Sequence, residues 1–125
     1  MSKPKPTPRI LVAEREDDVR AYLERALRLA GYPGVAVAAD ARGAARLARA
    51  LEPDLVVLSV HLGAATGFDA LAAMRAAGCR ARALFYSGDD APEHRERAAA
   101  MGAAFLAKPA TLEELLGLVR ALLGG

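Results

Sequence analysis

Cysteine is nearly absent from this 125-residue sequence, since Cys79 is the only one, and this excludes an internal disulfide and any zinc site built on several cysteines. Two histidines, His61 and His94, are too few to replace them, so we expect no metal site. Tryptophan is absent and aromatic residues make up only 5% of the chain, so the core must consist mainly of leucine, valine and alanine. No apolar run approaches the ~18 residues of a membrane span, and no signal-peptide core follows the basic start. We therefore expect a cytoplasmic protein that does not contact a membrane.

Excess positive charge is confined to the first nine residues. The formal net charge is +2, but without Lys3, Lys5 and Arg9 the remaining 14 basic residues nearly balance the 15 acidic ones. This distribution argues against a direct nucleic-acid partner. Residues 1–8 are basic and rich in proline, and we expect them to form a flexible tail. Residues 9–125 have the length of one domain.

Short apolar runs alternate with longer helical patterns along this domain. Strands are predicted over residues 9–13, 35–39, 55–59, 81–87 and 103–107, and helices over residues 17–30, 41–51, 68–77, 92–101 and 111–123. Strict alternation predicts an α/β fold, a doubly wound five-stranded parallel sheet with five helices on both faces. Val57 is expected to face the opposite layer from Val56 and Leu58, with all three buried. Functional residues in such a sheet lie where the strands end.

The segments that follow the strands exclude several enzyme classes. The turn after the first strand, Glu14–Asp18, contains no glycine and carries negative charge, which excludes dinucleotide-binding and phosphate-binding glycine loops. Ser59 lacks the flanking glycines of a hydrolase nucleophile. Ser59 and His61 are close enough in sequence to form a nucleophile–base pair, but a buried serine beside a loop histidine is the favoured interpretation. We expect no enzymatic activity.

The same segments, taken in order, carry a family resemblance. An acidic cluster follows the first strand, Ser59 ends the third, Ser87-Gly88 follows the fourth, and Lys108-Pro109 follows the fifth. This order and spacing resembles the receiver domain of two-component response regulators over residues 9–123. The resemblance implies a flavodoxin-like (CheY-like) sheet with strand order 2-1-3-4-5 and makes residues 9–125 a receiver-like domain.

In that family, two acidic residues after the first strand hold Mg²⁺, and an aspartate that ends the third strand accepts a phosphoryl group from a histidine kinase. By the resemblance, Glu14 stands at the first acidic position and Arg15 at the second, with Glu16 next to them, while Ser59 stands at the phospho-acceptor position. A serine cannot form the acyl phosphate, and Arg15 places a cation where Mg²⁺ would bind. We expect the Arg15 guanidinium to contact Glu14, Glu16 or Ser59, and Mg²⁺ binding to be lost, which leaves no cofactor.

Three further positions match the family pattern, and each also has a structural interpretation. Ser87 falls at the switch hydroxyl, but it can equally cap the turn that precedes the fourth helix. Phe105 falls at the switch aromatic, but core filling is the favoured role. Lys108 falls at the conserved lysine, and here we expect it to form an ion pair with Glu14.

The sequence thus predicts a pseudo-receiver, a degenerate receiver domain that acts as a phosphorylation-independent protein-interaction module, as a monomer or weak homodimer. The partner is expected to be another signalling protein: a kinase, an output domain or a regulator. In this family the binding face is usually formed by the fourth helix, fifth strand and fifth helix. That face would include Glu93, Arg95, Glu96, Arg97, Phe105, Glu113 and Glu114.

Two alternatives remain open. Arg15 and Lys108 could bind an anion or a nucleotide phosphate in the altered pocket. Alternatively, the domain could be phosphorylated at a non-standard residue such as Asp18 or Asp54.

Overall fold

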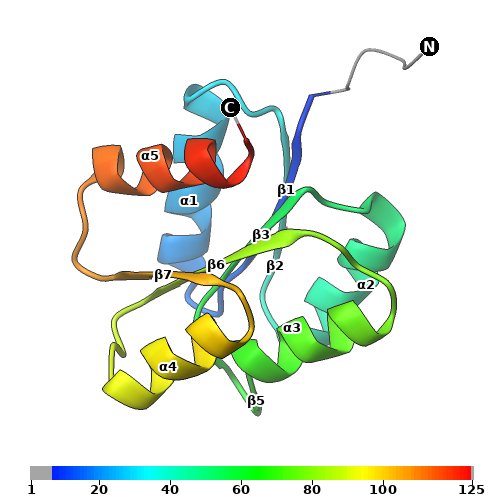
Figure 1. The fold of residues 1–125 in the computed structure, drawn as a ribbon. Coiled ribbons are helices and arrows are strands. Elements are labelled where there is room, and N and C mark those ends of the chain that lie inside the picture. The colour runs from blue at the N-terminus through cyan, green and yellow to red at the C-terminus, as the bar shows by residue number, and fades with distance from the viewer. Residues whose placement is uncertain (1–6, 125) are drawn as a thin grey trace.

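The computed structural model describes residues 7–124, and a five-stranded parallel sheet lies at its centre (Figure 1). The strands are β1 (Arg9–Ala13), β2 (Gly34–Ala38), β3 (Leu55–Leu58), β4 (His61–Leu62), β5 (Ala65–Thr66), β6 (Arg82–Ser87) and β7 (Ala104–Ala107). The helices are α1 (Asp17–Leu29), α2 (Ala41–Leu51), α3 (Gly67–Ala76), α4 (Pro92–Ala100) and α5 (Leu112–Leu122). The sheet order is β2-β1-β3-β6-β7, which confirms the predicted order because β6 and β7 are its fourth and fifth strands.

The predicted boundaries of the five sheet strands and the five helices agree with the structure to within one residue. The third strand ends at Leu58 rather than Ser59, which leaves Ser59 as the first residue after β3. Residues 1–6 of the predicted tail lie outside the described residues, whereas Thr7 and Pro8 immediately precede β1.

A short β-hairpin between β3 and α3 was not predicted. Strands β4 and β5 pair antiparallel, with His61 opposite Thr66 and Leu62 opposite Ala65. The two connecting residues begin with Gly63 at φ 80°, a left-handed conformation that glycine adopts at little cost. The hairpin matters for the site because it carries His61 beside the carboxyl end of the sheet.

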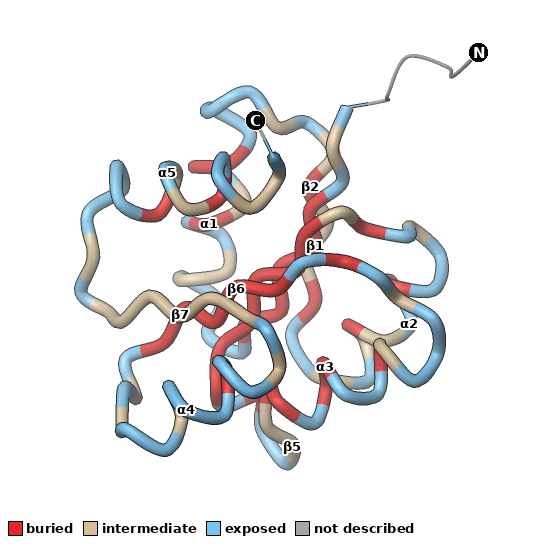
Figure 2. Tube along the Cα trace, in the orientation of Figure 1, coloured by how far each residue is buried: buried red, intermediate tan, exposed pale blue. Residues whose placement is uncertain are grey.

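The core consists of two apolar layers, one on each face of the sheet. Strand β3 contributes to both: Val57 packs with residues of α1 and α5, whereas Val56 and Leu58 pack with residues of α2, α3 and α4. All three side chains are at most 1% exposed, so the predicted alternation is confirmed. Figure 2 shows buried residues along the central strands, with exposed positions on the outer faces of the helices.

Two capping boxes define where α3 and α5 begin. The Thr111 hydroxyl accepts a hydrogen bond from the backbone N–H of Glu114, and the Glu114 carboxylate accepts one from the Thr111 backbone. An equivalent capping box joins Thr66 and Asp69 at the start of α3. In each case the threonine backbone N–H stabilises the ionised acid, which lowers the pKa of Asp69 and of Glu114.

Among residues 7–124, no helix is long and apolar enough to cross a membrane.

Candidate functional site

The residues predicted for the acidic, phospho-acceptor, switch-hydroxyl and lysine positions line one pocket at the carboxyl end of the sheet. The pocket has a volume of about 320 Å³ and is open to solvent. Its lining residues come from the segments that follow β1, β3, β6 and β7: Glu14, Arg15, Glu16, Ser59, His61, Ser87, Gly88, Asp89 and Lys108. Three of them, Glu14, Ser59 and Ser87, are the buried polar residues of the described chain.

Glu14 and Lys108 form the ion pair that the sequence analysis predicted. The Lys108 Nζ lies 3.5 Å from Glu14 Oε1, and the Glu14 side chain is only 5% exposed. The second carboxylate oxygen of Glu14 accepts a hydrogen bond of 2.9 Å from the backbone N–H of Glu16. Lys108 also lies over the ring of Tyr86, 4.9 Å from its centroid. The one buried carboxylate of the pocket is therefore already satisfied within the protein.

Removing Lys108 alone should destabilise the fold. We expect Lys108→Met to lower the free energy of unfolding by about 1–3 kcal/mol, because it leaves the nearly buried Glu14 carboxylate without its cation. The double variant Glu14→Gln/Lys108→Met should lose less than the sum of the two single variants, with a coupling of about 0.5–3 kcal/mol. Urea unfolding gives the free energy of unfolding of the wild type, the two single variants and the double variant. Strictly additive losses would show that the pair contributes nothing to stability.

The Ser59 hydroxyl forms a hydrogen bond with the backbone rather than with a side chain that could act as a base. Its hydroxyl donates a hydrogen bond of 2.8 Å to the carbonyl oxygen of His61, and its side chain is buried. The His61 ring points elsewhere, since its Nε2 lies 2.6 Å from Asp89 Oδ2. The nucleophile–base pair considered for Ser59 and His61 is thus not formed.

Ser87 and Phe105 both make contacts that fit the structural interpretations given in the sequence analysis. The Ser87 hydroxyl accepts a hydrogen bond of 3.2 Å from the backbone N–H of Asp89 and so stabilises the turn before α4. Phe105, on β7, is half-buried and packs against the apolar layer that α2, α3 and α4 cover. The Arg95 guanidinium lies 5.1 Å from its ring centroid, a cation–π contact that covers the outer face of the ring.

The predicted contact of Arg15 was wrong. Arg15 lines the pocket but is exposed, and its guanidinium forms no ion pair or hydrogen bond with any residue from 7 to 124. The physical reason is that Lys108 and a backbone N–H already satisfy Glu14, and an exposed pair with Glu16 would gain little over solvation. Any effect of Arg15 on a cation in the pocket must therefore act through its charge and not through a contact.

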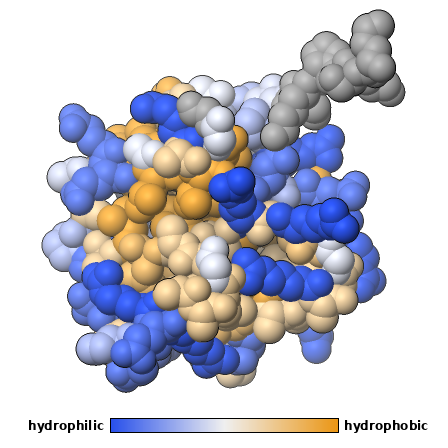
Figure 3. Space-filling view, viewed as in Figure 1, coloured by the Kyte–Doolittle hydropathy of each residue, from blue (hydrophilic) through white to orange (hydrophobic). Residues whose placement is uncertain are grey.

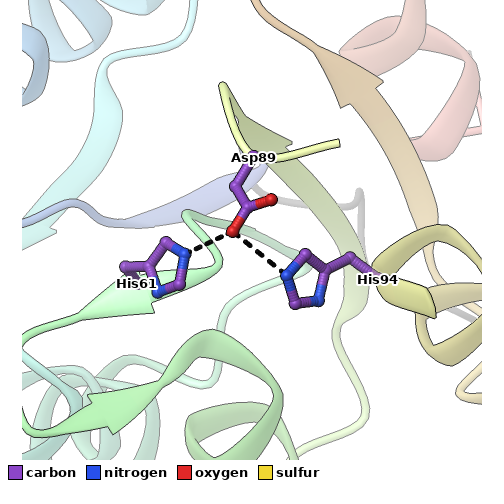
Figure 4. Close-up of side chains that lie close together, drawn as sticks. All are labelled: His61, Asp89 and His94. Atoms are coloured by element: carbon purple, nitrogen blue, oxygen red, sulfur yellow. Dashed lines mark hydrogen bonds and ion pairs between the residues drawn. The ribbon is translucent and has the colours of Figure 1, made fainter. Parts of the chain in front are cut away.

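Asp89 is the site residue that sequence analysis missed. Its Oδ2 accepts contacts from His61 Nε2 at 2.6 Å and from His94 Nε2 at 3.1 Å (Figure 4). The hydrogen bond from His61 lowers the pKa of the Asp89 carboxyl. The three residues come from β4, the β6–α4 loop and α4, so no local motif could have revealed the cluster. The sequence analysis expected no metal site because two histidines are too few, but it did not foresee the carboxylate between them.

The non-standard phosphorylation sites lie apart from the pocket. Asp54 precedes β3 at the opposite end of the sheet, where its Oδ2 accepts a hydrogen bond of 2.9 Å from the Arg9 backbone. Asp18, in the first turn of α1, is exposed and accepts a hydrogen bond from the backbone N–H of Val19. Neither residue lines the pocket that contains Ser59 and Lys108.

The charged residues assigned to the interaction face are all exposed. They are Glu93, Arg95, Glu96, Arg97, Glu113 and Glu114. Arg97 lies over the buried Phe68 ring, 4.8 Å from its centroid, and 3.8 Å from Asp69. Arg97 therefore also connects α4 to α3.

The comparisons with known proteins agree with this geometry. The family model described as "Response regulator receiver domain" matches residues 10–120. The transcriptional regulatory protein PrrA of Mycobacterium tuberculosis is 36% identical over 118 residues, which cover 94% of this chain and 50% of that protein. The transcriptional regulatory protein PdtaR of the same species is 36% identical over 111 residues, 86% of this chain and 53% of that protein. The chain spans about half the length of these curated relatives.

Solved structures give the same result for the fold. The chemotaxis protein CheY4 of Vibrio cholerae superposes with a TM-score of 0.86 at 27% identity, over 94% of this chain and 99% of that one. The HemR receiver domain of Leptospira biflexa superposes with a TM-score of 0.86 at 28% identity, over 94% of this chain and 95% of that one. The fold and the pocket define a CheY-like signalling domain. The chain belongs to the response regulator receiver domain family of two-component signalling, whose members interact with kinases and output domains.

Proposed function

We propose that this receiver domain is a pseudo-receiver, a protein-interaction module that does not use aspartyl phosphorylation. The observation that carries the proposal is Ser59, a buried serine directly after β3, whose hydroxyl is engaged by the carbonyl of His61. A serine there supplies neither the carboxylate that forms an acyl phosphate nor a charged ligand for Mg²⁺.

The charges around Ser59 support the same proposal. Magnesium needs several oxygen ligands, normally including carboxylates. The buried carboxylate of Glu14 is paired with Lys108 at 3.5 Å, and Arg15 stands at the second acidic position. A divalent cation would have to displace Lys108 and tolerate the charge of Arg15. We therefore propose that the pocket binds no Mg²⁺ at millimolar concentration and that the domain is not an enzyme.

The alternative of anion binding has less support. The pocket contains two cations, Arg15 and Lys108, against the three carboxylates of Glu14, Glu16 and Asp89. An incoming phosphate would meet this net negative charge, and it would compete with Glu14 for Lys108. Arg15 is the one cation of the pocket that has no ionic partner within residues 7–124.

A surface suited to a protein partner lies over β7 and α5. All four residues of β7 are only half-buried at the edge of the sheet. Figure 3 shows apolar side chains gathered over α5 and between α5 and β7. Leu106, Leu116 and Leu118 are incompletely covered members of the adjoining layer, and Leu112 is 41% exposed. We propose that this surface, bordered by the charged residues of α4 and α5, binds another signalling protein, with neither nucleic acid nor membrane as a direct partner.

A titration of the pocket tests the proposal. Amide NMR shifts of Glu14, Ser59 and Ser87 are followed while Mg²⁺, and separately inorganic phosphate, is added to the wild-type protein up to ~10 mM. We expect no saturable change with either ion. Saturable Mg²⁺ shifts centred on Glu14 would overturn the pseudo-receiver proposal, whereas saturable phosphate shifts lost in Arg15→Gln would establish the anion-binding alternative.

A further inference from the structure

At the rim of the pocket, three side chains of types that often bind metals point at one another. His61 and His94 direct their Nε2 atoms to the same carboxylate oxygen of Asp89, and Figure 4 shows the two rings on either side of it. One ligand atom from each residue lies within 4.8 Å of those of the other two. Imidazole nitrogen and carboxylate oxygen are ligands that Zn²⁺ and its neighbours in the first transition series prefer.

The two separations that involve Asp89 are close to what a metal ion requires. In a tetrahedral zinc site with bonds of about 2.0–2.1 Å, ligand atoms lie about 3.3 Å apart. The Asp89–His94 separation of 3.1 Å already approaches this value, and the Asp89–His61 separation of 2.6 Å would have to widen slightly. The His61 side chain is 60% exposed, so its ring has the freedom to move. Three protein ligands would leave a fourth position for water.

The more buried side of the cluster is already fixed. The His94 ring stacks on Phe68 with centroids 5.7 Å apart and an interplanar angle of 29°. Phe68 is itself buried and packs on Phe85 at 4.5 Å. Asp89 is positioned by the hydrogen bond of its backbone N–H to Ser87. The His94 ring and the backbone that carries Asp89 are therefore held in place before any ion binds, which reduces the entropy cost of binding.

We propose that His61, Asp89 and His94 form a binding site for a divalent transition-metal ion of the Zn²⁺ class. The site differs in residues and in chemistry from the Mg²⁺ site of the receiver family, because Mg²⁺ demands an octahedral set of oxygen ligands. The proposal does not rest on the loss of phosphorylation. A bound ion would connect the β4–β5 hairpin, the β6–α4 loop and α4.

The test is direct binding of Zn²⁺ to the chain without an affinity tag, measured by competition with a chromophoric chelator. We expect one saturable site per chain that millimolar Mg²⁺ does not displace. His61→Ala and Asp89→Asn should each weaken the Zn²⁺ affinity by at least about tenfold. Even the loss of a residue that only hydrogen-bonds a metal ligand lowers metal affinity by about 10–100-fold. The matched controls are Asp90→Asn, at the exposed neighbour of Asp89, and Cys79→Ser, which removes the only thiol; both should bind as the wild type does.

A spectroscopic measurement assigns the ligands independently of affinity. The chain has only two histidines, so a ¹⁵N spectrum of the imidazoles reports on the proposed ligands alone. Zn²⁺ should shift the Nε2 resonances of both rings together at one equivalent. Absence of saturable binding at ~100 µM Zn²⁺, or equal affinities for wild type, His61→Ala and Asp89→Asn, would overturn the proposal. That result would leave the pseudo-receiver function untouched.

Discussion

Replacing Leu58 with alanine is expected to lower the free energy of unfolding by about 2–5 kcal/mol. Leu58 is fully buried on β3, the central strand, and packs in the layer between the sheet and α2, α3 and α4. The neighbouring Phe85, which pairs with Leu58 across β6, is itself packed on Phe68, so the layer cannot collapse fully into the cavity that the substitution leaves. Urea unfolding at constant m-value measures the loss.

The matched control for Leu58→Ala is Leu29→Ala at the end of α1. Leu29 is 78% exposed, so the same chemical change should alter stability by less than about 0.5 kcal/mol. Equal effects at the two positions would contradict the assignment of β3 to the centre of the core.

Restoring two carboxylates should create a Mg²⁺ site. The double variant Arg15→Asp/Ser59→Asp is expected to bind Mg²⁺ saturably in the millimolar range, whereas the wild type shows no saturation. The physical reason is charge: the five ionised groups of the pocket are three acids and two bases, and the two substitutions remove one cation and add two carboxylates. Amide NMR titration with Mg²⁺ measures the affinity.

Ser59→Asp alone should bind Mg²⁺ at least about tenfold more weakly than the double variant, because Arg15 and Lys108 would still offset the new carboxylate. A second control, Arg25→Asp/Ser59→Asp, makes the same change in net charge but places it on an exposed arginine of α1 away from the pocket. It should behave like Ser59→Asp. If all three variants bind Mg²⁺ equally well, the position of Arg15 has no part in the loss of the metal site.

Much of the secondary structure was predictable because each helix and strand follows from a local pattern of apolar and polar residues. The apolar run over residues 55–59 predicted a strand buried on both faces, and Val57 packs in the opposite layer from Val56 and Leu58, as expected. The β4–β5 hairpin escaped prediction because two-residue strands have no detectable period, although Gly63 is typical of such a turn.

The site was predictable only in part, for a different reason. The resemblance placed Lys108 near Glu14, and the ion pair between them is present. The position of Arg15 was not predictable, because the free energy of an exposed arginine is similar whether its guanidinium is hydrated or forms an ion pair with one of several nearby acids. The cluster of His61, Asp89 and His94 depends on contacts across 28 residues of chain, and only the folded sheet brings its members together.

The central claim is that this receiver domain does not form an aspartyl phosphate. Its most direct test is to incubate the wild-type protein with acetyl phosphate and Mg²⁺ and to record the intact mass before and after hydroxylamine treatment. We expect no phosphoryl adduct on the wild type, and a hydroxylamine-labile adduct on no variant other than Arg15→Asp/Ser59→Asp. A labile phosphoryl group on the wild-type protein would contradict the central claim.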